Sequence, residues 1–309
     1  MTPRIVLAFT AFKGTLTPTQ ACAAADLPGA ILLPVADGGD GTLDVLPGRR
    51  RRARVTGPLG RPVWASFKID GATAIVEMAE ASGLRLVAPA KRNPLVTTTR
   101  GTGELVLAAR RAGATRILLG VGGSATVDAG RGALEVLTDA SDVVVLCDVR
   151  TTLLDAPRVY GPQKGATPSM IPRLEARMRA LPRRVWRLAG SGAAGGLAGG
   201  LASIGARLVA GSGYILRELA FRQRTRRASL VITGEGRFDR TSLAGKATGA
   251  VIAASRAPVV VVCGTSELTP RQAGVRAIVE LVDVDRDPLG HPARAIRAAV
   301  AQVILGSSR

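Results

Sequence analysis

Residues 120–130, GVGGSATVDAG, place closely spaced glycines and hydroxyls directly after a short apolar run. Ile117–Leu119 predict a buried strand, and Ala133–Leu137 predict the start of a helix. A glycine-rich turn between a strand and a helix leaves backbone N–H groups unpaired, and the helix dipole favours negative charge there. The stretch therefore predicts an anion site, with a plain tight turn as the alternative. The candidate phosphate-binding residues are Gly122, Gly123, Ser124 and Thr126, and the candidate magnesium ligand is Asp128.

The length and composition limit the classes of protein to which this chain can belong. With 309 residues and 47% hydrophobic composition, the chain can bury one large core or two moderate ones, and the length favours two domains. The apolar run near the N-terminus is too short for a signal peptide, and no later apolar run is long enough for a bilayer. We therefore expect a cytoplasmic protein without membrane contact. Cys22, Cys147 and Cys263 are odd in number and far apart, which predicts reduced, buried thiols.

The basic balance of the chain raises the question of nucleic-acid binding. The formal charge is +19, but aromatic residues make up only 3%, and the arginines are scattered apart from runs at Arg49–Arg54 and Arg222–Arg227. Because base stacking needs aromatic side chains, we expect a solvated arginine-rich surface and no specific nucleic-acid partner. The same positive field would steer an anionic small molecule toward the protein.

Lysine is rare in this chain and is often next to glycine. Lys13, Lys164 and Lys246 each adjoin a glycine, which places a compact positive charge where the backbone can be approached closely. This arrangement is typical of phosphate sites. For Lys164, in the segment GPQKGATP, the alternative is a surface turn before the helix predicted at residues 169–180.

Two acids follow the second predicted strand. Arg4–Phe9 and Ile31–Val35 predict strands, separated by a helix that begins at Thr17-Pro18. Asp37 and Asp40 lie in the segment ADGGDGT directly after the second strand. Open α/β sheets bind ligands at the carboxyl ends of their strands, so these acids could hold magnesium or accept a hydroxyl proton. A turn followed by a helix N-cap is the alternative.

A change of pattern divides the chain into two parts. Alternation of strands and helices gives way to a predicted hairpin of Val63–Ile69 and Ala74–Met78, whose turn is Asp70-Gly71. Alternation resumes toward the C-terminus. We therefore predict an α/β domain of residues 1–55 and 225–309, interrupted by an inserted α/β domain of residues 56–224, with a cleft between the two.

A further charged stretch is GEGRFDRTSLAGKA, which follows a predicted strand at residues 230–233. So many charges in one connection are costly to bury without phosphate or metal as partners. The stretch is not a Walker A loop, because Arg240 and Ala247 stand where that motif needs glycine and a hydroxyl residue. Its candidate site residues are Glu235, Arg237, Asp239 and Lys246.

The segment Gly190–Gly195, GSGAAG, matches the G-x-G-x-x-G pattern of dinucleotide-binding proteins. That pattern also needs an acidic residue about twenty positions further on, and the corresponding stretch IGARLVAGSGYI has none. We therefore predict that these glycines serve tight helix packing.

Taken together, these motifs resemble the bacterial glycerate kinase family, of the glycerate 2-kinase type, over nearly the full length of the chain. The segments that carry the resemblance are AFKGT, ADGGDGT, TGPLGRPV, EMAEASGL, RNPLVTTTRGTGEL, GVGGSAT, GPQKGA, GSGAAGGL and ITGEGRFD followed by S-L-A-G-K. The resemblance implies a flavodoxin-like (Rossmann-like) domain interrupted by a domain of restriction-enzyme-like topology. It also implies phosphorylation of D-glycerate, to 2-phosphoglycerate, by direct transfer from ATP with Mg²⁺ in an interdomain cleft.

The resemblance carries over to the charged candidates, which match the family's residue types. Phosphoryl transfer depends chiefly on alignment and charge neutralisation, so we assign Lys13, Lys164 and Lys246 to the phosphates. Arg237 is assigned to a two-pronged contact with the glycerate carboxylate, and Asp37 is assigned as hydroxyl base or magnesium ligand. The magnesium ligands or their supporting residues would be Asp128, Glu235 and Asp239.

The sequence also departs from the family's usual pattern near these candidates. Thr10-Ala11 replace Asp-Ser, Val127 replaces Asn, Ala129 replaces Gly, Arg150–Thr152 replace Asp-Asn-Pro, and the stretch between Leu137 and Val143 is shorter. A lost acid or a reversed charge changes metal and substrate contacts. Two alternatives therefore stay open: a kinase-like protein that binds nucleotide or an acidic metabolite without turnover, and a kinase for a different small hydroxy acid. The protein could also form a homo-oligomer.

Overall fold

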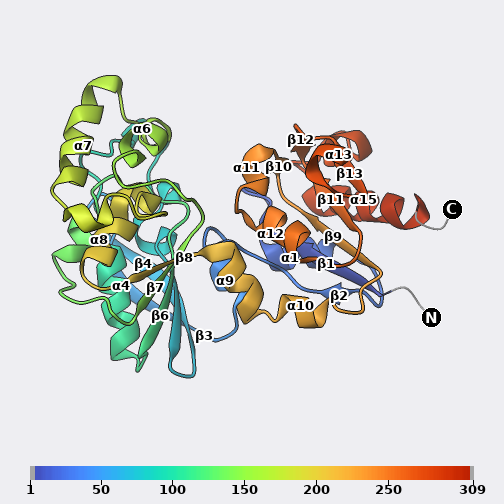
Figure 1. The fold of residues 1–309 in the computed structure, drawn as a ribbon, viewed down its shortest axis with the longest axis horizontal. Helices are drawn as coiled ribbons and strands as arrows, with labels where there is room; N and C mark the ends of the chain where they lie inside the picture. Colours follow the sequence, from blue (N-terminus) through green and yellow to red (C-terminus); the bar gives the residue numbers. More distant parts are fainter. Residues whose placement is uncertain (1–3, 307–309) are drawn as a thin grey trace. The chain divides into compact units, whose positions relative to one another are not determined.

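The computed structural model describes residues 4–306 and divides into two compact units (Figure 1). The first unit comprises the described parts of Met1–Asp37, Asp44–Leu46 and Ser212–Arg309, and the second comprises Gly38–Leu43 and Pro47–Gly211. Each unit has its own sheet and its own core. Within residues 4–306, no helix combines the length and the apolar character that a membrane span requires.

The first unit alternates strands and helices along the chain. Its elements are β1 (Ile5–Phe9), α1 (Pro18–Ala24), β2 (Ile31–Leu32), α9 (Gly211–Glu218), α10 (Phe221–Arg224), β9 (Leu230–Gly234), β10 (Arg237–Phe238), α11 (Arg240–Leu243), α12 (Ala247–Ala254), β11 (Val259–Cys263), β12 (Thr265–Ser266), α13 (Pro270–Ala273), β13 (Ala277–Glu280), α14 (Leu281–Val284) and α15 (Pro292–Gly306). A short helix, α2 (Thr42–Val45), lies at the boundary between the units.

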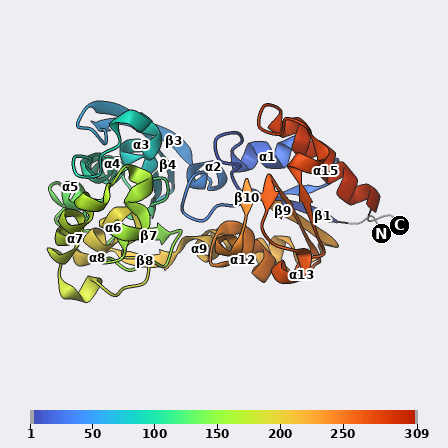
Figure 2. The same ribbon diagram turned by 90° about the horizontal axis from the view of Figure 1, so that it is seen from above.

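The sheet of the first unit is parallel, in the order β13-β11-β9-β1-β2. Numbered along the chain, this is the order 2-1-3-4-5, which is common in doubly wound α/β proteins. Successive side chains of a strand point to opposite faces, so Leu7 and Phe9 pack toward α1 and α15, whereas Val6 and Ala8 pack toward α12. Figure 2 shows α1 and α15 on the opposite side of β1 and β9 from α12. Burial of both faces explains why these strands are continuous apolar runs.

The second unit contains a larger mixed sheet. Its strands and helices are β3 (Arg49–Thr56), β4 (Pro62–Asp70), β5 (Thr73–Glu77), α3 (Ala79–Ser82), α4 (Arg100–Arg111), β6 (Arg116–Gly120), α5 (Arg131–Leu134), β7 (Val143–Cys147), α6 (Ala156–Tyr160), α7 (Ile171–Arg179), α8 (Leu197–Ser203) and β8 (Arg207–Ala210). Short 3₁₀ turns occur at η1 (Leu84–Leu86), η2 (Pro89–Lys91), η3 (Pro162–Lys164), η4 (Pro168–Met170), η5 (Arg183–Val185) and η6 (Ala193–Gly196).

The six strands of this sheet follow the order β3-β4-β5-β6-β7-β8. The β3–β4 and β4–β5 pairs are antiparallel, and the later pairs are parallel. The predicted hairpin is confirmed, but its turn lies one residue later than predicted: Asp70 is still paired, with Thr73, so the two turn residues are Gly71 and Ala72 rather than Asp70 and Gly71. Helices α4 and α8 cover one face of the sheet, where Leu105 and Leu197 join a core with Phe67 and Leu119.

The basic run at residues 49–54 forms most of β3, a strand that the sequence analysis did not predict. Its regular structure comes from pairing with the apolar strand β4, where Arg51 lies opposite Phe67 and Ala53 lies opposite Ala65. This pairing also places β3 in the second unit. Conversely, Leu216 and Phe221 pack with Val231, so helices α9 and α10 lie in the first unit. The observed units therefore divide the chain at somewhat different residues from the predicted domains.

The glycines of the GSGAAG segment pack tightly, as the sequence predicts. A Cβ on Gly195, whose φ is +63°, would lie 2.0 Å from the Thr126 carbonyl oxygen. A Cβ on Gly192 would lie 2.3 Å from the Thr152 carbonyl oxygen. Backbone packing thus accounts for these glycines without a dinucleotide.

The predicted N-terminus of α1 is confirmed and provides a test of local stability. The Thr17 hydroxyl accepts a hydrogen bond from the Gln20 N–H at 3.3 Å, and the Gln20 side chain accepts one from the Thr17 N–H at 3.0 Å. We expect Thr17→Ala to lower the free energy of unfolding by about 1 kcal/mol, measured by chemical denaturation. The control is Thr19→Ala, one residue inside the helix and also exposed, and an equal loss in both variants would contradict the capping role.

Candidate functional site

The carboxyl ends of β1 and β9 meet where the strand order of the first unit reverses. From β1 the chain continues to β2 on one side, and from β9 it continues to β11 on the other. Open α/β sheets bind ligands at such a switch point. The two loops that leave it are joined by Thr10, whose N–H and hydroxyl each lie 3.1 Å from the Gly234 carbonyl oxygen and donate to it.

These two loops carry most of the charged candidates of the first unit. Lys13 is exposed on the loop after β1, and a Cβ on Gly236 would lie 3.9 Å from its backbone nitrogen. Glu235 and Lys246 lie on the connection from β9 to α12, with Lys246 at the N-cap position of α12. The fold therefore brings residues from opposite ends of the chain to one edge of one sheet.

Glu235 is the carboxylate with the least satisfied environment in this loop. Its Oε1 atom is buried and has no hydrogen-bond partner within residues 4–306, and the same holds for the Thr248 hydroxyl. Burial is the main cause that raises the pKa of Glu235, and the negative charge of Asp37 raises it further, whereas Thr248 and Lys246 oppose the rise. An unpartnered buried oxygen near a second carboxylate is the kind of donor set that a cation can complete.

Asp239 and Arg237 already have protein partners. Asp239 caps α11, because its Oδ1 accepts from the Thr241 N–H at 2.8 Å and from the Ser242 N–H at 3.2 Å. Although burial opposes the shift, these hydrogen bonds together with the Thr241 hydroxyl and the charge of Lys246 lower the pKa of Asp239. Arg237 is largely exposed and forms an ion pair with Glu267. Asp239 thus holds the loop, and Arg237 remains accessible.

In the second unit, the ADGGDGT and GVGG segments pack backbone against backbone. The Gly122 N–H donates to the Gly38 carbonyl at 3.2 Å. A Cβ on Gly122 would lie 2.3 Å from the Gly39 Cα, and one on Gly38 would lie 2.4 Å from the Leu146 carbonyl oxygen. The exposed Asp40 lies over Gly123, where its Oδ1 would be 2.9 Å from an added Cβ.

The helix expected just after this glycine-rich segment differs from the prediction. It is α5, which begins at Arg131 and spans four residues, so its N-terminus is not at the glycines. Several amides of the segment are also occupied: Gly122 bonds to Gly38, and the Ala125 N–H donates to Ser82 at 2.9 Å. The Thr126 side chain is fully buried. Phosphate binding by Gly122, Gly123, Ser124 and Thr126 stays a prediction, without support from a helix dipole at this point.

Lys164 is buried beneath the glycine-rich segment rather than on a surface turn. Only 3% of the residue is exposed, and its Nζ donates to the Ser124 hydroxyl at 2.6 Å and to the Thr126 carbonyl at 2.8 Å. Burial lowers the pKa of Lys164 from its ordinary value of 10.5 to about 8, and the negative charges of Asp148 and Asp128 oppose this shift. In this arrangement Lys164 holds Ser124 and Thr126 in place.

Asp128, the third candidate magnesium ligand, is surrounded by hydrogen-bond donors. Its carboxylate accepts from the N–H and hydroxyl of Thr99 at 2.9 and 2.8 Å, and from the N–H groups of Gly130 and Gly132 at 3.1 and 3.2 Å. It therefore joins the start of α4 to the start of α5. Within residues 4–306, no group of three or more His, Cys, Asp and Glu side chains is placed to share a metal ion.

Two carboxylates that the sequence analysis did not assign lie at the carboxyl ends of strands in the second unit's sheet. Glu77 ends β5 and is buried, and its Oε1 accepts from the Leu43 N–H at 2.6 Å. Burial raises the pKa of Glu77 to about 7, and the Leu43 hydrogen bond opposes the rise. Asp148 follows β7, and its Oδ2 would lie 3.3 Å from a Cβ on Gly122. Glu77 is the first residue of the segment EMAEASGL and lies near the end of a predicted strand. That position was the signal from which it could have been chosen as a candidate.

A doubly wound parallel sheet with lysines and carboxylates at its switch point is typical of α/β enzymes that bind phosphorylated ligands. The model of the glycerate kinase family matches residues 5–140 and 135–304, and the chain belongs to this family. The two matched segments meet at residues 135–140, within which the stretch that is shorter than usual in the family begins.

Individual relatives agree with this assignment. The chain is 37% identical to a glycerate 2-kinase of Escherichia coli K12 over 79% of each chain. It is 38% identical to a glycerate kinase of Bacillus subtilis 168 over 90% of each chain. A crystal structure from Salmonella typhimurium LT2, provisionally named glycerate kinase 2, matches with a TM-score of 0.78 and 32% identity, covering 99% of this chain and 100% of that one.

The buried Lys164 predicts a specific dependence of stability on pH. Its pKa is lower in the folded protein than in the unfolded chain, so between about pH 8 and 10.5 the unfolded chain binds more protons and stability rises with pH. We expect the free energy of unfolding of the wild type, relative to Lys164→Met, to rise by about 3 kcal/mol in all across this window. Denaturant titrations at a series of pH values measure this difference.

The matched control is Lys91→Met, which removes an exposed lysine and should show no comparable slope. A difference between wild type and Lys164→Met that is flat or falls between pH 8 and 10.5 would contradict the burial of a titrating ammonium group at this position.

Proposed function

We propose that this protein phosphorylates D-glycerate with ATP and Mg²⁺, with 2-phosphoglycerate as the product. The observation that carries the proposal is the convergence of Lys13, Glu235 and Lys246 on the switch point of a doubly wound sheet. Membership in the glycerate kinase family and the names of the relatives support the acceptor. The strand order supports a flavodoxin-like first unit. A restriction-enzyme-like inserted domain, an interdomain cleft, a cytoplasmic location and a homo-oligomer stay predictions.

The residues at the switch point fit a magnesium ion. Mg²⁺ is commonly held by one or two carboxylates together with phosphate oxygens and water. Glu235 offers an unpartnered buried oxygen, and Asp37 is close enough to influence its pKa. We therefore infer that Glu235 and Asp37 hold the ion, with Asp239 fixing the loop beside them. When bound, Mg²⁺ would neutralise phosphate charge during transfer.

The other charged residues would align the substrates. Lys13 and Lys246 would neutralise the charge that develops on the transferred phosphoryl group. Asp37 would accept the hydroxyl proton if Glu235 alone serves the metal. Arg237 would bind the glycerate carboxylate through two parallel N–H donors. Gly122, Gly123 and Ser124, held by Lys164 from beneath, remain the proposed phosphate-binding segment of the second unit.

The primary test measures ADP release by the purified protein with ATP, Mg²⁺ and D-glycerate, and identifies the product by NMR. We expect glycerate-dependent turnover that is lost on chelation of magnesium. Asp37→Asn and Glu235→Gln should each reduce kcat by about 100-fold or more, because general-base and metal-binding groups contribute at this scale. The control Glu135→Gln removes an exposed carboxylate on the surface and should leave turnover unchanged.

Absence of turnover, combined with a rise of the melting temperature in ATP, would contradict the reaction and support a nucleotide-binding protein without glycerate kinase activity. Turnover with another small hydroxy acid, but not with glycerate, would show a changed acceptor. Turnover of the native sequence with D-glycerate would show that Thr10 is compatible with activity.

Arg237 gives a separate test of acceptor recognition. We expect Arg237→Gln to raise KM for glycerate about tenfold or more with a smaller effect on kcat, because a carboxylate contact made in both ground and transition states acts on binding. Steady-state kinetics with varied glycerate measure this. Arg240→Gln, an exposed arginine of the same loop, is the control. A fall in kcat without a change in KM would place Arg237 elsewhere in the reaction.

A further inference from the structure

Strand β3 forms an open edge of the second unit's sheet, and the proposed reaction does not use its arginines. In the described sheet β3 pairs with β4 alone. Alternate residues of an antiparallel edge strand direct their backbone groups away from the partner strand. The Thr56 N–H points away from β4, since it donates to Glu104 at 2.7 Å. By this alternation, Arg50, Arg52 and Arg54 also present N–H and C=O groups to the open edge.

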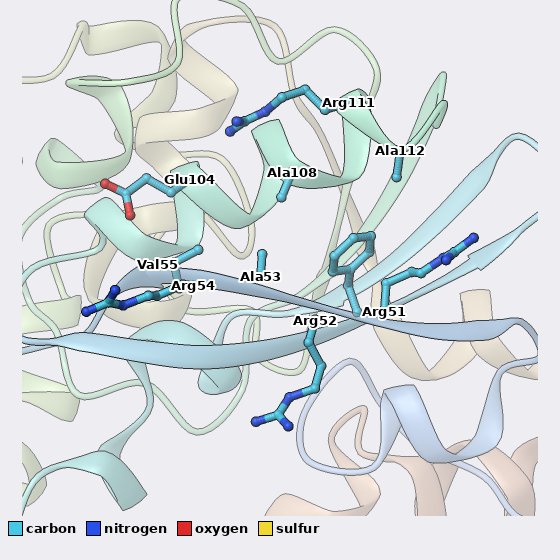
Figure 3. A pocket seen from close by; sticks show the side chains of 10 residues that line it. Arg51, Arg52, Ala53, Arg54, Val55, Glu104, Ala108, Arg111 and Ala112 are labelled. Atoms are coloured by element: carbon cyan, nitrogen blue, oxygen red, sulfur yellow. The ribbon is translucent and has the colours of Figure 1, made fainter.

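A groove of about 690 Å³ runs along this edge between β3 and α4. Figure 3 shows Ala53 on the strand and Ala108 on the helix facing each other across it, while Arg52 points away from α4. Phe67 and Val55 add to the apolar lining. Five consecutive residues of β3 line the groove, together with residues of α4 spaced along one helix face. This lining is that of a channel for an extended segment rather than of a closed cavity.

The charge of the groove is positive and uncompensated. Arg51, Arg54 and Arg111 are exposed at its rim, and none of them forms an ion pair with a carboxylate in the described part of the chain. Glu104, the acid in the lining, is already bound by Thr56 and by Arg100 at 3.0 Å. An occupant that supplies carboxylates would therefore gain ion pairs without breaking any.

We propose that this groove binds an extended acidic segment of another protein, which adds a strand to β3 and places its carboxylates beside Arg51, Arg54 and Arg111. Addition of a strand to a sheet edge uses backbone hydrogen bonds for affinity and alternate side chains for specificity. The open backbone N–H and C=O groups of β3 would provide the affinity, and the arginines beside the apolar lining would provide the specificity.

The observations disfavour other occupants. Pairing of β3 with β3 of a second copy would set arginine opposite arginine, which is unfavourable in a cross-strand pair. Charged edge strands are indeed a common protection against such self-association. A polynucleotide would match the charge, but it lacks the alternating donors and acceptors that the β3 edge offers. The partner chemistry that meets both features is an acidic polypeptide in extended conformation.

The test uses the full-length protein and a fluorescent eight-residue peptide that alternates glutamate and valine. Binding is measured by fluorescence polarisation. We expect saturable binding that weakens with salt. Two further peptides have the same sequence but carry N-methyl groups at every second residue, one at the odd positions and one at the even positions. At least one of the two should bind at least tenfold more weakly than the unmethylated peptide. N-methylation keeps the charge but removes the backbone donors, so this loss separates strand addition from simple charge attraction.

Protein variants locate the site. Arg51→Glu/Arg54→Glu/Arg111→Glu should weaken binding at least tenfold, and so should Ala112→Trp, which fills the groove from an exposed position without a change of charge. The matched control, Arg222→Glu/Arg224→Glu/Arg227→Glu, makes the same charge change on exposed residues of the first unit. Thermal unfolding confirms that each variant is folded, and Arg→Gln at the same three positions replaces the first variant if it is not.

Several outcomes would overturn the proposal. These are binding of both N-methylated peptides as tight as that of the unmethylated peptide, an equal effect of the control variant, and no effect of Ala112→Trp. Displacement of the peptide by a single-stranded RNA oligomer or by inorganic phosphate at lower concentration than by unlabelled peptide would show a different class of ligand. None of these measurements depends on kinase activity, so they are independent of the proposed function.

Discussion

The close approach of two glycine-rich backbones holds the candidate site of the second unit together. Gly122 bonds to Gly38 at 3.2 Å, and any side chain on Gly122 would overlap the Gly39 Cα. Because main-chain atoms make the contact, a side chain at Gly122 would force the two segments apart. At the end of the same segment, the Leu43 N–H donates a hydrogen bond to the buried Glu77 carboxyl group. Asp40 is thereby held over Gly123 by backbone packing rather than by its own side-chain contacts.

The first unit places charge differently. Its parallel strands bury both faces, so polar side chains can gather only where the strands end. Glu235 follows β9 directly and is partly buried, and its Oε1 has no hydrogen-bond partner within residues 4–306. Asp239, by contrast, is fully engaged as a helix cap. The same loop thus satisfies one acid and leaves a buried oxygen of its neighbour unpaired, and this difference supports the proposed metal site at Glu235.

The arginine-rich strand shows how one feature can serve two physical purposes. Like charges on an open edge disfavour pairing of that edge with a second copy of itself. The arginines also line a groove against α4 in which the carboxylate of Glu104 is paired with Arg100, and no ion pair within residues 4–306 involves Arg51, Arg54 or Arg111. The net charge of +19 is therefore distributed as a surface with at least one structured positive groove, and not only as a diffuse field.

Local signals in the sequence determined much of this protein. Continuous apolar runs predicted the parallel strands, Thr17-Pro18 predicted the start of α1, and Asp70-Gly71 predicted the hairpin with its turn one residue too early, because each depends on residues close in the chain. Motif order gave the family. The tertiary structure alone decided that arginines 49–54 form a strand, since its regularity comes from pairing with β4.

The tertiary structure also decided what each charged candidate contacts. Lys164, assigned to phosphate with a surface turn as the alternative, is buried under Ser124, and Asp128 is enclosed by donors from Thr99 and from two glycine amides. The contact between the Leu43 N–H and the Glu77 carboxyl group is likewise visible only in the tertiary structure, because the two residues are 34 positions apart. The sequence specifies which charges are present and which strand ends they follow. Whether a charge is free to meet a ligand depends on partners that are distant in the chain, and these are set by packing.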